Sequence, residues 1–226
     1  MLIVLEGIDG SGKGTQSVKL VESLKQKGAD VALFAFPRYT ITRFGAVVGQ
    51  YLNGDFGVGV HPKVASTLYA CDRFESKHDL EAQLAVRDIV VCDRYVPSNL
   101  AHQCAKLNKE EGTKLAHWIC DIEYGLFQVP VPDLVICLDL SVESAAKLIE
   151  KKAQRAYTEK KADLHECDLE YLKAVRNWYS FLPTSNCSRH RQWEVVSVER
   201  NGHLRSVDQV FEDVWQVAES ACKDII

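Results

Sequence analysis

The stretch that most constrains the fold of this chain is the glycine-rich segment 7–16, GIDGSGKGTQ, which follows the apolar run 2–6. Gly7, Gly12 and Lys13 match the phosphate-binding pattern G-x-x-x-x-G-K-[ST]. Glycines in such a loop let successive backbone N–H groups point at a phosphate, and the helix that follows adds the positive end of its dipole. Strand, loop and helix occur in the required order, so we favour a nucleotide phosphate site over a chance match.

The loop departs from the pattern at one position. A hydroxyl usually follows the lysine and reaches Mg²⁺, but Gly14 stands there and the hydroxyl comes one residue later, at Thr15. Adenylate kinases have a similar G-K-G-T loop, so nucleotide binding does not depend on that hydroxyl. We therefore expect Mg²⁺ to be held mainly by phosphates, water and carboxylates supplied elsewhere. The residues expected to bind ATP are Gly7, Gly10, Ser11, Gly12, Lys13, Gly14 and Thr15.

Five short runs rich in β-branched and apolar residues predict strands, and the amphipathic stretches between them predict helices. The strands are expected at 2–6, 31–36, 89–93, 134–140 and 193–198. Strands that alternate with helices form a parallel sheet that is covered on both faces. No repeat or Pro/Gly linker divides the sequence. We predict one α/β domain, 1–226, with a P-loop NTPase fold: a five-stranded parallel sheet with helices on both faces.

Composition limits the partners and the compartment. A net charge of −4 and a pI near 6.0 argue against general binding to nucleic acid or anionic membranes. No apolar run reaches the length of a membrane span, and a first strand at Leu2 leaves no room for a signal peptide, so we expect a cytoplasmic protein. The eight cysteines form no C-x-x-C pair, and His165 and Cys167 lack the second ligand pair of a zinc site. We interpret the cysteines as buried apolar residues in a reducing compartment.

Three segments place an aromatic side chain beside an arginine. They read FPRY (36–39) after the second predicted strand, LYACDRFE (68–75) on a predicted helix, and CDRYVPSNLAHQ (92–103) after the third strand. Open parallel sheets bind their ligands at the carboxyl ends of the strands. There an aromatic ring can stack on a base, and an arginine can bind a phosphate through two hydrogen bonds.

Each of these segments also has a structural alternative. Tyr69 is then an ordinary core residue, Arg73 a surface residue paired with Asp72, and Asp93 with Arg94 an ion pair. Together these alternatives leave three aromatic–arginine clusters at one edge of the sheet unexplained, so we favour a binding site.

A basic segment follows the fourth predicted strand. Residues 151–161 read KKAQRAYTEKK, and the acidic residues Asp163 and Glu166 come next. A solvated charge run is the structural alternative. Beside a phosphate loop we favour a lid, at about 151–163, that closes over bound nucleotides.

These motifs, in their order and spacing, resemble the thymidylate (dTMP) kinases over nearly the whole chain. The matching motifs are E-G-x-D-G-x-G-K at 6–13, F-P-R-Y at 36–39, D-R at 72–73, D-R-Y-x-x-S-N at 93–99, P-D-L at 132–134, and the basic lid with its acidic pair. Any one of them is weak, whereas the ordered set is specific. The resemblance implies a nucleoside monophosphate kinase fold with a short lid, dTMP and ATP as substrates, Mg²⁺ as cofactor, and a homodimer.

For the acceptor nucleotide, the resemblance implies that Arg94 binds the dTMP phosphate, aided by Arg73, which also approaches the thymine edge. Tyr69 stands where the family stacks an aromatic ring on thymine. Asn99 matches the bacterial-type variant, in which an asparagine contacts the base. His102 replaces a tyrosine that the family often has beside the deoxyribose. The other residues implied in dTMP binding are Asp9, Phe36, Pro37, Arg38, Tyr39 and Glu166.

For the transfer step, the family carries its catalytic cation in one of two places. One is the phosphate-loop position after the aspartate, where this chain has Gly10, and the other is the lid, where Arg155 fits. The residues implied in catalysis are Lys13, Arg94, Arg155 and Asp93. The implied Mg²⁺ ligands are Asp9, Asp93 and Glu166.

The expected reaction is in-line transfer of the γ-phosphoryl group of ATP to the phosphate of dTMP. Rival hypotheses are another nucleoside monophosphate kinase acting on UMP, CMP or AMP, a deoxynucleoside kinase, and an ATP-binding regulatory protein without transfer activity. The run NKEE at 108–111 lacks the final aspartate of the GTPase motif N-K-x-D, and DFG at 55–57 occurs without the H-R-D of protein kinases. No partner in nucleic acid or membranes is expected.

Overall fold

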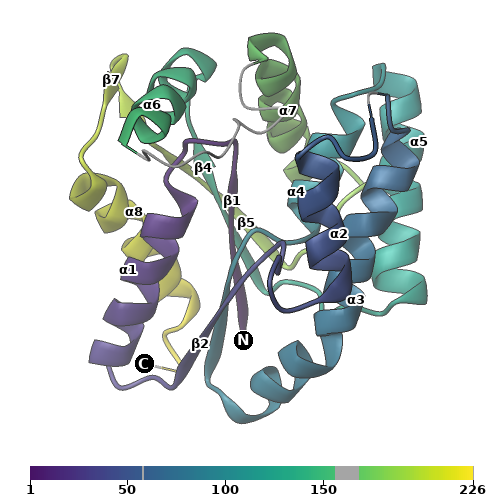
Figure 1. Ribbon diagram of the computed structural model, residues 1–226. Helices are drawn as coiled ribbons and strands as arrows, with labels where there is room; N and C mark the ends of the chain where they lie inside the picture. The colour runs from purple at the N-terminus through teal and green to yellow at the C-terminus, as the bar shows by residue number, and fades with distance from the viewer. Residues whose placement is uncertain (58, 156–167, 226) are drawn as a thin grey trace.

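The structure, a computed structural model, describes residues 1–57, 59–155 and 168–225, with backbone alone for 151–155. In this part of the chain a parallel sheet of five strands forms the centre, in the order β2-β3-β1-β4-β5 (Figure 1). The strands are β1 (Leu2–Gly7), β2 (Val31–Ala35), β3 (Ile89–Asp93), β4 (Leu134–Asp139) and β5 (Gln192–Ser197). The predicted α/β fold is confirmed, with strand ends displaced by a residue. The second strand stops before Phe36 because Pro37 has no N–H for a ladder.

Helices cover both faces of the sheet. On one face α1 (Lys13–Gln26) packs beside α8 (Val207–Ala221), and on the other lie α3 (Pro62–Val86), α4 (Val96–Cys104) and α5 (Lys109–Cys120) (Figure 1). The remaining helical elements are α2 (Arg43–Leu52), η1 (Asp121–Leu126), α6 (Val142–Arg155), α7 (Leu169–Phe181) and η2 (Leu182–Thr184). The two layers of helix bury the central strands β1, β3 and β4 almost completely, as their apolar composition predicts, whereas the edge strands β2 and β5 stay partly exposed.

The apolar periodicity of the last helix is explained by its packing. Val210, Val214 and Ala218 are buried against the sheet, and a capping box begins the helix. The Ser206 hydroxyl accepts from the Gln209 N–H at 3.2 Å, and the Gln209 side chain accepts from the Ser206 N–H at 2.9 Å. These two bonds satisfy backbone donors that a helix start otherwise leaves open.

The register of the central strands sets where the site lies. β1, between β3 and β4, is buried along its whole length. Leu5 pairs with Asp93 and Gly7 pairs with Leu138, so the loop after β1 and the turn after β3 leave the sheet side by side. The strand order changes direction at this edge, where open α/β sheets bind their ligands.

Two segments differ in detail from the sequence-based expectation. α6 continues into the basic segment as far as Arg155, and the rest of the predicted lid, together with Asp163, His165, Glu166 and Cys167, is outside the described residues. The chain after β5 forms a small antiparallel hairpin of β6 (Glu199–Arg200) and β7 (His203–Leu204).

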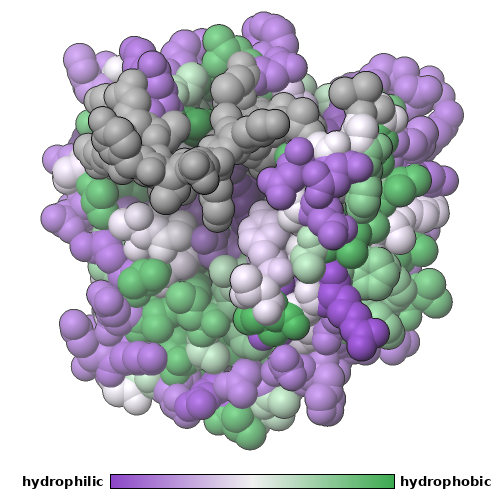
Figure 2. Space-filling model, viewed as in Figure 1, coloured by the Kyte–Doolittle hydropathy of each residue, from purple (hydrophilic) through white to green (hydrophobic). Residues whose placement is uncertain are grey.

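The surface view in Figure 2 shows hydrophilic side chains interspersed with hydrophobic groups. Within the described part of the chain, every helix is too short or too polar to cross a membrane. Cys92 and Cys137 are buried in β3 and β4, as their apolar surroundings predict.

Candidate active site

The phosphate loop connects β1 to α1 and is built on backbone geometry. Gly7 has φ 138, and a Cβ atom there would lie 2.5 Å from the carbonyl oxygen of Leu138. Gly12, the residue before α1, adopts a left-handed conformation, with φ 91, and no side chain caps the helix start. The first N–H groups of α1 therefore remain free to bind an anion, which their partial positive charge favours.

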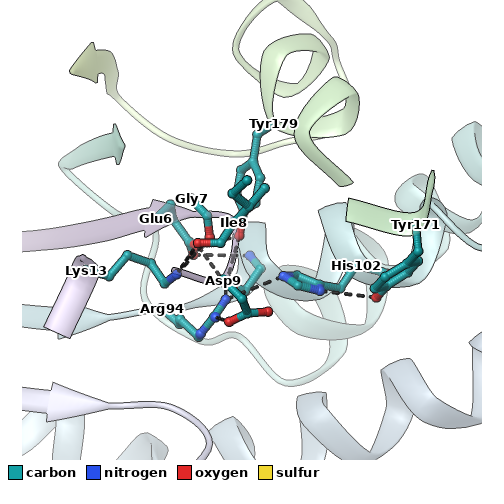
Figure 3. Close-up of polar contacts among 10 residues, drawn as sticks. Glu6, Gly7, Ile8, Asp9, Lys13, Arg94, His102, Tyr171 and Tyr179 are labelled. Atoms are coloured by element: carbon teal, nitrogen blue, oxygen red, sulfur yellow. Dashed lines mark hydrogen bonds and ion pairs between the residues drawn. The ribbon is translucent and has the colours of Figure 1, made fainter. Parts of the chain in front are cut away.

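Lys13 is folded back over this loop. Its Nζ donates to the carbonyl oxygens of Gly7 at 3.0 Å and Ile8 at 2.8 Å (Figure 3). Its side chain is buried, and that burial, with the nearby positive charge of Arg94, lowers the pKa of Lys13 to about 8. A lysine held this way places its charge at the mouth of the loop, where an anionic ligand would restore the usual pKa.

The missing hydroxyl at position 14 has a structural counterpart. A Cβ atom on Gly14 would lie 3.1 Å from Oδ2 of Asp93. The Asp93 carboxylate at the end of β3 therefore lies close to the position where other phosphate loops carry a hydroxyl side chain. Asp93 Oδ1 is buried and has no hydrogen-bond partner among the described residues. An unpaired carboxylate oxygen beside a phosphate loop fits a hard cation such as Mg²⁺. No group of three metal-ligating side chains occurs in the described segments, which do not include Glu166.

Arg94 follows β3 in a left-handed conformation, with φ 65, and its backbone N–H donates to Leu5 O at 3.0 Å. Its guanidinium forms an ion pair with Asp9 of the phosphate loop and donates to the Ser98 hydroxyl at 3.2 Å (Figure 3). Burial alone would raise the pKa of Asp9, but Arg94 and Lys13 hold it below its usual value. The structural alternative of an Asp93–Arg94 ion pair is therefore wrong, because Arg94 pairs with Asp9.

A buried glutamate holds the turn that carries Arg94. Glu6 in β1 is 0% exposed and accepts from the backbone N–H groups of Tyr95 at 2.8 Å and Ser98 at 3.1 Å. The hydroxyls of Ser98 and Tyr179 donate to its other oxygen at 2.6 and 2.8 Å. Burial raises the pKa of Glu6 despite these bonds. The carboxylate thus ties β1, the turn and α7 together beneath the site.

His102 of α4 lies beside Arg94 and close to Asp9 of the phosphate loop. Its Nε2 is 3.5 Å from Arg94 Nη1, and its Nδ1 is 3.2 Å from the hydroxyl of Tyr171 (Figure 3). That hydroxyl has one hydrogen, which it donates to the backbone oxygen of His102 at 3.1 Å. Nδ1 must therefore carry the imidazole proton, and Nε2 faces Arg94 as an acceptor. Burial and the nearby cations lower the pKa of His102 to about 3, so the ring is neutral.

The residues expected to contact the nucleobase lie on α3 and α4. Arg73 is 3% exposed and pairs with Glu123 of η1, not with Asp72, so the surface interpretation of Arg73 is wrong. Asn99 of α4 is also buried and donates to the same carboxylate at 2.8 Å. The Tyr69 ring is half-buried and meets another tyrosine, Tyr51, edge to face with centroids 6.4 Å apart.

The segment after β2 lines the same side of the molecule. Phe36 is buried against the ring of Tyr95, and a cis peptide bond joins it to Pro37. The Arg38 backbone N–H donates to Asp72 at 3.0 Å, whereas its guanidinium bonds Asp79 and lies away from Arg94. The Tyr39 side chain is 46% exposed. In this segment Phe36 is therefore part of the buried core beside Tyr95, and the Arg38 guanidinium is held by Asp79.

Comparison with known proteins decides the family. The family model described as "Thymidylate kinase" matches residues 5–192. The chain belongs to the thymidylate kinase family. It is 35% identical to the thymidylate kinase of Mycobacterium tuberculosis over 69% of this chain and 73% of that protein. It is 34% identical to a probable thymidylate kinase of Thermococcus onnurineus over 97% of both chains. The thymidylate kinase structure from Candida albicans shares the fold, with a TM-score of 0.69 at 22% identity, covering 97% of this chain and 91% of that one.

Arg155, the arginine expected to be catalytic, occupies the last position of α6. Arg155 ends that helix, and Glu166 is outside the described residues, so their roles stay predictions. The phosphate loop reaches α6 through Gly10, where a Cβ atom would lie 2.9 Å from the oxygen of Ala145. A movement of α6 would therefore displace the phosphate loop or require it to adjust.

Two buried carboxylates, Glu6 and Glu123, were not identified as site residues from the sequence. Glu6 could have been identified from the sequence, because an acidic residue at the end of an otherwise apolar strand indicates a buried carboxylate. Glu123 carries none, because the helical stretch around it contains other acidic residues, and its partners lie 50 and 24 positions away in the sequence. Both are fully buried, and both hold residues that the motifs identify.

Proposed function

We propose that this member of the thymidylate kinase family transfers the γ-phosphoryl group of ATP to the phosphate of dTMP, giving dTDP and ADP. The observation that carries the proposal is the convergence of Lys13 and Arg94 at one edge of the sheet, where Asp9 lies between them. One cation belongs to a phosphate loop, and the other belongs to the neighbouring turn. Two anionic groups can thus be bound end to end.

The mechanism needs positioning and charge neutralisation rather than a strong base, because the accepting phosphate is already an anion. Lys13 would neutralise the outer phosphates of ATP, and the backbone N–H groups of the loop, with Ser11 and Thr15, would bind the rest of the chain of phosphates. Arg94 would bind the dTMP phosphate in line with the transferred group. Arg155 would add charge in the transition state when the lid closes and excludes water.

Mg²⁺ would be held by Asp93, whose buried Oδ1 lacks a partner among described residues, with Asp9 and Glu166 as further ligands. When bound, the ion would neutralise phosphate charge and orient the β- and γ-phosphates. Asp93 also borders Gly14, so its carboxylate faces the loop without a hydroxyl between them.

The acceptor base would stack on Tyr69 and meet Arg73 and Asn99 at its edge. Phe36 and Pro37 would form the pocket wall. Arg38 and Tyr39 would approach the phosphate or sugar after ligand binding, and His102 would lie beside the deoxyribose. The protein is proposed to be a single-domain cytoplasmic homodimer that acts on small molecules and not on nucleic acid or membranes.

A coupled assay of ADP release tests this proposal. Purified protein with ATP and Mg²⁺ is given dTMP, UMP, CMP, AMP or thymidine in turn. Preference for dTMP supports the proposal. Preference for a ribonucleotide would indicate another nucleoside monophosphate kinase. Phosphorylation of thymidine itself would indicate a deoxynucleoside kinase. Binding of ATP without any transfer would indicate a regulatory protein.

A further inference from the structure

A carboxylate from the hairpin after β5 completes the cap of α6. Ser141 is the residue before that helix, and its hydroxyl accepts from the Ser144 N–H at 3.3 Å. In a capping box, a glutamate three positions after the capping serine accepts from the backbone N–H of that serine in return. Ser144 stands at this position, and its side chain is too short for the role. Glu199 takes its place and accepts from the Ser141 N–H at 3.0 Å.

Glu199 also accepts from two serine hydroxyls. The Ser141 hydroxyl donates to its Oε1 at 2.9 Å, and the Ser144 hydroxyl donates to the same oxygen. Burial alone would raise the pKa of Glu199, but these hydrogen bonds and the nearby charge of Arg176 hold it below its usual value. The dipole of α6 favours an ionised carboxylate at this end of the helix. The start of α6 is therefore bound to Glu199 by three hydrogen bonds to a charged acceptor.

The backbone that carries Glu199 is held by the sheet, and Figure 1 shows the hairpin beside α6. β4 and β5 pair as far as Asp139 and Ser197, and the Val198 N–H donates to Asp139 O at 2.8 Å. The Ser197 hydroxyl then donates to Glu199 O at 2.7 Å. Glu199 therefore ties the first turn of α6 to the end of the sheet.

The phosphate loop packs against this same end of α6. A Cβ atom on Gly10 would lie 2.9 Å from the oxygen of Ala145 and 3.3 Å from Cγ1 of Ile149. Ala145 is fully buried, and its N–H donates to Ser141 O at 2.9 Å. The serine that Glu199 holds is thus bonded to the residue that supports the loop. Close-packed contacts of this kind pass a shift of the helix on to the loop.

We propose that Glu199 is a positioning residue for ATP, which holds α6 where Ala145 supports Gly10 and so keeps the phosphate loop in its binding shape. Glu199 acts through α6 and does not contact the phosphates. The loop binds phosphates with successive backbone N–H groups, and these must all point at the ligand at once. A small displacement of the loop therefore weakens ATP binding. This inference rests on the proposed function, which assigns ATP to the phosphate loop.

The test compares Glu199→Ala with the wild-type protein. The Kd for ATP is measured by calorimetry, and kcat and KM are measured for ATP and for dTMP. We expect the Kd and KM for ATP to rise about tenfold, because binding and catalysis fall steeply when a site is misplaced. The KM for dTMP should change little, because its proposed contacts lie mainly on α3, α4 and the turn after β3.

Asp133→Asn is the matched control. Asp133 is also half-buried, accepts from the Leu2 N–H at 2.7 Å, and pairs with Arg191 at the opposite end of β4. This substitution should lower the melting temperature and leave the Kd for ATP unchanged. An equal rise in the Kd for ATP in both variants would show that a general loss of stability is responsible, and would overturn the inference.

A second substitution separates positioning from helix capping. Adding Ser144→Glu to Glu199→Ala gives α6 a capping box of its own, in which the new carboxylate accepts from the Ser141 N–H. This double variant should regain the melting temperature of the wild type but not its Kd for ATP, because α6 is still detached from the hairpin. Recovery of both quantities would show that Glu199 only caps the helix, and the positioning role would be wrong.

Two further results keep the inference distinct from the proposed function. If ATP binds and no nucleotide is phosphorylated, the proposed function fails, while the Kd values for ATP still test the role of Glu199. If Glu199→Ala does not fold, Glu199→Gln replaces it, because glutamine keeps the length of the side chain and loses only the charge. A Kd for ATP about threefold above that of the wild type then supports the inference, and an unchanged Kd contradicts it.

Discussion

Arg94 in the turn after β3 is ion-paired with Asp9 in the loop after β1, and this pair joins the two segments that we propose to bind the phosphates. The pair forms because β1 and β3 are neighbours in register, with Leu5 opposite Asp93. It orients the guanidinium before any ligand arrives. Preorganised charge at the point where two phosphates meet lowers the cost of bringing them together.

Replacing Arg94 by lysine should be severe although the charge is kept. A lysine lacks the planar fork that bonds Asp9, Ser98 and a phosphate oxygen at once, so kcat/KM for dTMP should fall about 100-fold while KM for ATP changes little. Arg87→Lys is the control, because Arg87 pairs with Asp30 at the other end of β3. Steady-state kinetics of both variants make the comparison. Equal values for the two would show that Arg94 does not contact the acceptor.

Replacing Lys13 by alanine should nearly abolish transfer. The loop would lose the charge that faces the outer phosphates, for a loss of about 1,000-fold or more in kcat. Lys19→Ala tests the same helix at a half-buried position, outside the phosphate loop, that pairs with Asp208. Thermal unfolding checks that both variants are folded. Retained transfer in Lys13→Ala would remove the basis of the loop assignment.

Replacing Arg155 by alanine should separate turnover from binding. A cation that touches the group in transfer acts in the transition state, so kcat should fall about 100-fold and KM for dTMP should hardly change. Lys147→Ala, an exposed position on the same helix, is the control. Comparable losses in kcat and dTMP affinity would contradict the catalytic role of Arg155.

His102 should make the protein less stable in mild acid. The pKa of about 3 in the folded protein lies below the usual 6.5, so between these values the unfolded chain binds a proton that the folded protein does not. The contribution of the neutral ring to the free energy of unfolding is complete above pH 6.5 and is lost as the pH falls toward 3. The loss is about 1–2 kcal/mol between pH 6.5 and 5. Urea unfolding of the wild type and His102→Asn at both pH values measures it. Parallel losses in the two proteins would show that His102 is not the group responsible.

Local patterns in the sequence predict the frame of this molecule well. The phosphate loop needs only glycines and a lysine in sequence, and the buried strands are apolar runs, so both are visible in Gly7–Lys13 and in 89–93. The sequence did not predict the ion pair of Asp9 with Arg94, which depends on β1 and β3 being neighbours in the sheet. Their ends then meet at one edge of the sheet.

The base end of the site could not be predicted in the same way. The sequence identifies Arg73 and Asn99, but their shared partner, Glu123, comes from a separate helical segment and belongs to no motif. Glu123 bonds both side chains inside the core, and the burial of a single polar residue depends on tertiary packing. The contact of the Arg38 guanidinium with Asp79 is likewise a tertiary contact that no local pattern in the sequence indicates.

The most direct test of the central claim is a crystal structure with dTMP and a non-hydrolysable ATP analogue bound together. The account predicts the γ-phosphate beside Lys13, the dTMP phosphate on Arg94 and the thymine ring against Tyr69, with the two phosphates facing each other. Thymidine monophosphate bound at any other place, or the two phosphates held apart with Arg94 still on Asp9 alone, would contradict it.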